Sequence, residues 1–132
     1  MKKFYFIILA VFIMSLSSCS SDDNGSSNSQ INPPNWIQGL WMTGEGLADT
    51  GFRFTSNDIT IILINTEVSQ KGYIKQFTDA GQNVSTNEEM DENSYSIILN
   101  YPAGQSVTYS FTRISDSKIT WDAVNNSVYI KH

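Results

Sequence analysis

Alternation of apolar and polar side chains in the C-terminal half of the chain is the feature that most constrains its fold. In residues 94–101 and 105–113 every second side chain is apolar or aromatic. These side chains are Tyr95, Ile97, Leu99, Tyr101, Val107, Tyr109 and Phe111. Because neighbouring side chains of a β-strand point to opposite faces, this period of two predicts two strands that each bury one face.

Shorter runs with the same pattern lie at residues 51–55, 118–122 and 127–131, and residues 59–64 are apolar on both faces. Turn-forming Asn, Asp, Ser, Gly and Pro residues separate most of these runs. Short connections favour antiparallel hairpins between sequence neighbours. We therefore expect a mainly β fold, a small antiparallel up-and-down barrel, with an open sandwich as the alternative.

Residues 66–80 depart from the β pattern, because their apolar side chains recur at helical spacing. These side chains are Tyr73, Ile74, Phe77 and Ala80. Thr66 suits the start of a helix and Gly81 suits its end. The sequence thus predicts one short helix around residues 66–80, which would cover outward-facing isoleucines of residues 59–64 that a lone barrel leaves exposed.

The N-terminus has the pattern of a secretion signal. Lys2 and Lys3 precede an almost wholly apolar run at residues 4–14, which is too short to span a bilayer. The following Leu16-Ser17-Ser18-Cys19 resembles the lipobox of bacterial lipoproteins. The resemblance implies that residues 1–18 are a lipoprotein signal peptide and that Cys19, the single cysteine, becomes acylated. The alternative is an ordinary secretory signal that ends in a cysteine by chance.

After the signal peptide, residues 19–35 comprise the cysteine to be lipidated and a polar, Ser-rich segment. The only large aliphatic side chain of this segment is Ile31. Such a composition predicts a flexible tether between the membrane and a domain at residues 36–132. Asp22 and Asp23 resemble the acidic export tag of surface lipoproteins in Bacteroidetes-type bacteria. The resemblance implies an outer-membrane protein displayed on the cell surface. The alternatives are a plain acidic spacer or retention in the periplasmic leaflet.

Composition argues against several functions. Without Lys2 and Lys3 the chain carries a net charge of about −7, so we expect no nucleic-acid partner. The single histidine is the final residue, His132, and no nucleophile or phosphate-loop motif is present. We therefore expect neither an enzyme nor a cofactor. Residues 87–93 carry four carboxylates but lack EF-hand spacing, and we interpret them as a solvated loop, not a metal site.

The start of the domain resembles lipocalins. Gly39 and Trp41 match the Gly-x-Trp signature at the head of the first lipocalin strand, and residues 110–132 are similar to the last hairpin of small lipocalin-like lipoproteins. The resemblance implies a lipocalin-like barrel in which Gly39 lets the chain enter and Trp41 plugs the closed end. Arg113 is then a candidate for the arginine that stacks on this tryptophan.

An inward-facing aromatic set is the candidate ligand-binding site. It comprises Trp41, Phe52, Phe54, Tyr95, Tyr109, Phe111 and Trp121. One interpretation is a pocket for a small apolar ligand inside a membrane-anchored binding lipoprotein. The other is a packed aromatic core in a structural or protein-interaction lipoprotein without a ligand. The sequence identifies no protein partner, so the expected partners are the membrane, through the lipid, and this ligand.

Overall fold

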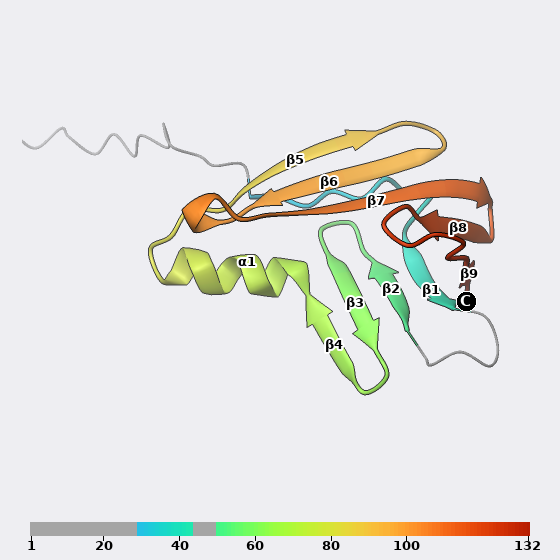
Figure 1. Ribbon diagram of the computed structural model, residues 1–132, viewed down its shortest axis with the longest axis horizontal. Coiled ribbons are helices and arrows are strands. Elements are labelled where there is room, and N and C mark those ends of the chain that lie inside the picture. The colour runs from blue at the N-terminus through green and yellow to red at the C-terminus, as the bar shows by residue number, and fades with distance from the viewer. Residues whose placement is uncertain (1–28, 44–49) are drawn as a thin grey trace, which may run out of the picture.

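The computed structural model describes residues 29–43 and 50–132 (Figure 1). The expected signal peptide, Cys19 and the acidic pair Asp22 and Asp23 lie outside the described residues. Among the residues that the structure does describe, no helix has the length and apolar character needed to cross a membrane.

The described chain consists of short strands, one α-helix and one 3-10 turn. Their order is β1 (Gly39–Thr43), β2 (Gly51–Phe54), β3 (Ile59–Leu63), β4 (Thr66–Ser69), α1 (Gln70–Asp79), β5 (Ser85–Met90), β6 (Ser94–Asn100), η1 (Pro102–Gly104), β7 (Ser106–Ser115), β8 (Lys118–Trp121) and β9 (Tyr129–Lys131).

All nine strands belong to one antiparallel sheet with the order β4-β3-β2-β1-β9-β8-β7-β6-β5. The first and last strands pair, with Trp41 opposite Lys131. The two edges are β4 and β5, and α1 lies between them in the chain. The up-and-down order expected from the sequence is confirmed, but the sheet curves into a half-barrel in place of the closed barrel, because the segment after β4 turns into a helix (Figure 1).

Side chains from alternate positions of the strands meet on the concave face of the half-barrel. Tyr95 lies opposite Phe111, and Ile97 lies opposite Tyr109, in the register of β6 and β7. All four are buried. The period of two therefore marks the buried face at these four residues, whereas Val107, which was expected on the same face, is 40% exposed. Gly51 belongs to the same core for a steric reason, since a Cβ there would lie 2.0 Å from the Trp41 carbonyl oxygen.

The predicted helix exists, but it begins at Gln70 and not at residue 66. Residues Thr66–Ser69 instead form β4 and pair with β3. The N-cap is Ser69, whose hydroxyl accepts the Gly72 amide at 2.9 Å. Asp58 fixes this start, because it accepts the Ser69 hydroxyl and, at 2.8 Å, the Lys71 amide. The helix ends at Asp79 with Ala80 as its C-cap, and Gly81 follows with a φ of 76°, the left-handed conformation that suits a helix stop.

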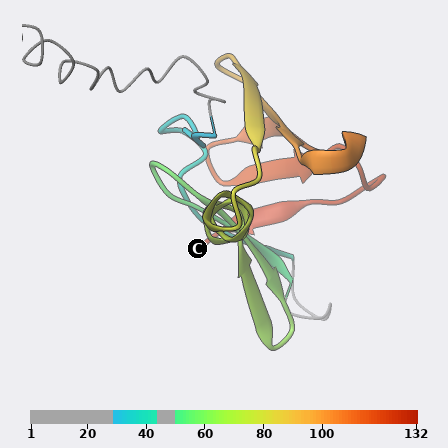
Figure 2. The ribbon, with the colours of Figure 1, turned by 90° about the vertical axis from the view of Figure 1, so that its left-hand side faces the viewer.

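The helix does not cover the isoleucines that it was expected to cover. Of the outward-facing isoleucines, Ile64 is 65% exposed and Ile62 is half-buried. The apolar side of α1 packs against the core instead, through the buried Ile74 and the partly buried Phe77. Figure 2, which views α1 end-on, shows the helix in front of the half-barrel with the chain before β1 on one side and β6 to β8 on the other.

Residues 29–38, which we call the strap, complete the domain on its N-terminal side. Ile31 and Ile37 are 3% and 0% exposed, and Pro33 is buried between them. The Thr86 hydroxyl donates to the Gln30 carbonyl at 2.6 Å, and the Trp36 indole donates to the Asp91 carbonyl at 3.1 Å. Part of the segment that composition assigns to the tether therefore packs against β5, and the contacts of the domain begin before residue 36.

The strap predicts a measurable contribution of Ile31 to stability. Ile31→Ala should lower the free energy of unfolding by about 2–5 kcal/mol, because it removes buried methyl groups and leaves a cavity. Chemical denaturation of the full mature chain measures this change. Ile114→Ala is the control, since Ile114 is 54% exposed and its loss should change stability by less than about 0.5 kcal/mol. Equal effects of the two substitutions would show that the strap does not stabilise the domain.

Candidate functional site

The structure brings the predicted ligand-binding aromatics together in the core. Trp41, Phe52, Phe54, Tyr95, Tyr109 and Phe111 are buried, and Trp121 is partly buried against them. Phe111 stands edge-on to two other rings, with centroids 4.9 Å from Phe52 and 5.0 Å from Phe54. Phe52 also contacts Trp121 and Tyr129, each at 5.2 Å.

These distances are those of aromatic rings in direct edge-to-face contact. The rings of Phe52, Phe54 and Phe111 thus fill the space beside one another, which favours the packed-core interpretation. Beside these rings, the Trp121 indole nitrogen is buried without a hydrogen-bond acceptor. An apolar ligand among these aromatics stays a prediction.

Trp41 of the Gly-x-Trp motif is buried, and its cationic neighbour is not the arginine that the resemblance suggested. Its ring is 0% exposed, and its indole donates to the Ile37 carbonyl at 2.6 Å. The cation over the ring is Lys131 on β9, 5.1 Å from the centroid. Gly39, with φ of 130°, makes room for this lysine, because a Cβ would lie 2.9 Å from its Cε. Arg113 stacks on Trp36 at 5.5 Å, so the pairing considered for Arg113 and Trp41 is wrong.

The acidic run that the sequence assigns to a solvated loop forms most of an edge strand and a tight turn. Residues Ser85–Met90 are β5, and Asp91 accepts the Asn93 and Ser94 amides at 2.7 Å. These bonds hold the pKa of Asp91 below its usual range. Within the part of the chain that the structure describes, no three or more His, Cys, Asp or Glu residues gather as a metal site.

Glu88 is the residue of this run with the most connections. Its carboxylate accepts the Asn32 amide at 2.7 Å, the Asn32 side-chain amide at 3.1 Å and the Tyr95 hydroxyl at 2.7 Å. It therefore joins the strap, the edge strand β5 and the buried ring of Tyr95. Burial, together with this carboxylate, raises the pKa of Tyr95. Sequence analysis missed this role because Asn32 lies 56 residues away along the chain.

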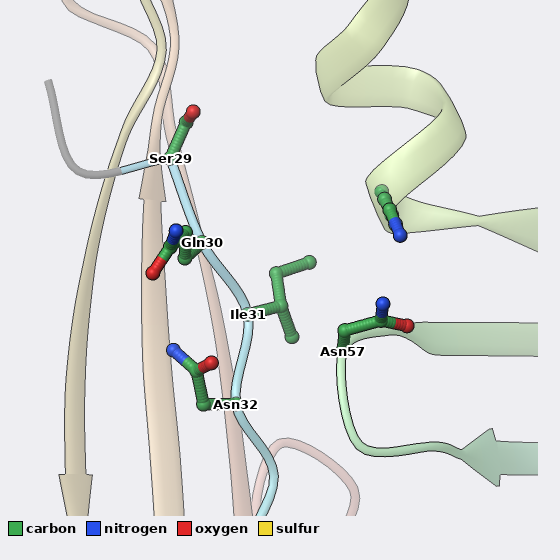
Figure 3. Close-up of a pocket in the computed structure, with 6 residues that line it drawn as sticks. Ser29, Gln30, Ile31, Asn32 and Asn57 are labelled. Carbon is green, nitrogen blue, oxygen red and sulfur yellow. The ribbon is translucent and has the colours of Figure 1, made fainter. Parts of the chain in front are cut away.

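Two surface hollows lie beside α1. The first, of about 270 Å³, is lined by strap residues, by Asn57 and by Lys71. Figure 3 shows the Ile31 side chain pointing across it toward Asn57, whereas Gln30 and Asn32 point away. Its walls are mainly the strap and the turn before β3, so it marks the seam between the strap and the half-barrel.

The second hollow, of about 250 Å³, is lined by Tyr73, Gln76, Phe77 and Gln82. The ring of Tyr101 lies behind these aromatics, 5.5 Å from Tyr73 and 5.1 Å from Phe77. The Tyr101 hydroxyl is buried and has no hydrogen-bond partner. Burial and the neighbouring Tyr109 and Tyr73 raise its pKa to about 12. The lining of this hollow therefore combines two aromatic rings with two side-chain amides, and the phenol of Tyr101 lies behind the rings. The sequence singled out none of these residues as a site.

Comparisons with protein-family models, with curated proteins and with solved structures each found no match.

The contacts of Glu88 predict a specific loss of stability. Glu88→Ala should lower the free energy of unfolding by about 1–3 kcal/mol, because the buried Tyr95 hydroxyl and the Asn32 donors lose their acceptor. Urea denaturation followed by tryptophan fluorescence measures the change. Glu89→Ala is the matched control on the same strand, since Glu89 is exposed. If the two variants were equally stable, Glu88 would not hold the strap.

Proposed function

We propose that this protein is a lipid-anchored, non-enzymatic binding module of the outer membrane that acts through its external surface. The observation that carries the surface role is the ring-to-ring packing of the inward aromatics, with Phe111 about 5 Å from both Phe52 and Phe54. A core filled in this way leaves the outer surfaces and rims to meet a partner.

Support for the anchor comes from the sequence. The only cysteine, Cys19, follows Leu16-Ser17-Ser18 at the end of an apolar run, in the arrangement that resembles a lipobox. Acyl chains on this residue would hold the protein on a bilayer, since each buried methylene contributes ~0.8 kcal/mol. Surface display is part of the proposal and is supported by Asp22 and Asp23.

The strap sets how far the domain can lie from such an anchor. Its first contact among the described residues is at Gln30, whose carbonyl accepts the Thr86 hydroxyl. A chain of the length from Cys19 to Ser29 can span at most about 35 Å. A tether of this length keeps the domain next to the membrane. A partner of the domain must therefore come close to the membrane surface.

A second candidate is the storage of a small apolar ligand among the aromatics. The specific observation that favours it is the buried Trp121 indole nitrogen without an acceptor. Buried polar groups normally have a partner, and a ligand carbonyl or hydroxyl would supply one.

The anchor is tested by replacing its attachment point. Cys19→Ser should abolish incorporation of a fatty-acid analogue and leave an unprocessed or mislocalised precursor. The reason is that serine lacks the thiol to which the diacylglyceryl group is attached. Metabolic labelling and membrane fractionation measure both effects. Equal labelling of variant and parent would contradict the proposal.

Surface display is tested in the same cells. Replacing Asp22 and Asp23 with Ala should reduce digestion by external protease, while Asp116→Ala on a distant exposed turn should not. Unchanged digestion of the first variant would refute display through the acidic pair and leave the anchor unaffected.

Native mass spectrometry of the acylated protein, purified from its own membrane, decides between the two binding modes. A packed core predicts the mass of the acylated chain alone. An additional small molecule that is released by Phe111→Leu, but retained by Ile114→Ala, would support the enclosed-ligand candidate and contradict the surface proposal.

A further inference from the structure

We propose that the hollow formed by Tyr73, Gln76, Phe77 and Gln82 is a binding site for one ring of a neutral carbohydrate. This inference deepens the proposed function, because it names the class of partner that the binding module would meet at its surface.

The site is built on the rigid part of the domain. Tyr73, Gln76 and Phe77 lie on α1, and Gln82 follows the end of the helix, where its amide donates to the Phe77 carbonyl at 2.9 Å. Tyr73 and Phe77 stand edge-to-face at 5.2 Å. Tyr101, just before η1, packs against both rings. The helix is fixed at its start by Asp58 and at its centre by the buried Ile74.

The chemistry of the lining selects the ligand. Tyr73 is 43% exposed. An exposed aromatic ring has an apolar face, and a ligand that packs on this face gains binding free energy by removing it from water. Gln76 and Gln82 each provide donors and an acceptor in one side chain. A sugar ring matches this set, since it presents C–H groups on its faces and hydroxyl groups around its rim. None of the described residues that line the hollow is charged, which favours a neutral ligand over an acidic or basic one.

The unpaired phenol of Tyr101 is the second observation that points to a ligand. A buried hydroxyl without a partner is destabilising in the free protein. Tyr101 is 8% exposed and directly contacts the two rings of the hollow. Exposed side chains change rotamer within nanoseconds, so rotation of the Tyr73 ring would give a ligand hydroxyl access to this phenol.

The size of the hollow restricts how much ligand it holds. Its volume of about 250 Å³ is below the range of roughly 300–1,000 Å³ that is usual for drug-sized ligands. One sugar ring is therefore the expected unit, and the rest of a glycan would continue into solvent.

The test uses the full chain as purified in detergent, whether or not it carries acyl groups, and an array of immobilised neutral glycans built from hexoses and N-acetylhexosamines. Sialylated glycans and a decaproline peptide are included as other classes of ligand. Tyr73→Ala should weaken binding at least tenfold by removing the stacking ring. Tyr101→Phe should weaken it about tenfold while keeping or raising the melting temperature, because it deletes an unpaired buried hydroxyl.

Tyr129→Phe is the matched control, since Tyr129 is equally buried but packs against Phe52 and not against α1. Its glycan binding should equal that of the parent. The proposal is overturned if the parent binds no neutral glycan at millimolar concentrations, if it binds only sialylated glycans or decaproline, or if Tyr73→Ala and Tyr101→Phe bind as the parent does. Because the assay needs only the folded protein, a failed anchor would be seen separately in the labelling of Cys19.

Discussion

The gap between β4 and β5 is the constraint on which the rest of the structure depends. These two strands are the edges of the nine-stranded sheet, and a curved sheet that does not close leaves its apolar concave face in need of cover. Two segments outside the sheet supply that cover. Helix α1 contributes Ile74 and Phe77, and the strap contributes Ile31 and Ile37. Glu88 links the strap to the sheet through Asn32 and Tyr95.

Local patterns in the sequence predicted most of the strands but missed β4 and β5, where pairing with a neighbouring strand decides the structure. The alternation around Tyr109 and Phe111 fixed the buried face of β7, because side-chain direction in a strand is a local property. The helix was placed four residues too early, because pairing of Thr66–Ser69 with β3 overrides a helical pattern. Residues 29–35 of the strap were taken for tether because they carry little apolar surface, and their contacts are with β5, more than fifty residues away.

The candidate site was also predictable only in part from the sequence. The inward aromatics were predictable as a group, but only the structure shows that Phe52, Phe54 and Phe111 contact one another. Trp41 is buried as one of these aromatics, and its cationic neighbour is Lys131, which pairing of β1 with β9 brings beside it. The hollow at Tyr73 combines residues from α1 with Tyr101 behind them. No spacing in the sequence predicts that these residues lie together.

Hydrogen exchange at the Asn32 backbone amide tests most directly whether the strap completes the half-barrel. This N–H donates to Glu88 at 2.7 Å, in a segment that composition alone would leave in solvent. The structure predicts that it exchanges slowly in the full mature chain, with protection approaching that of the paired amides of β6. Exchange at the rate of an unstructured peptide, while β6 stays protected, would contradict the account and show that the half-barrel stands without its strap.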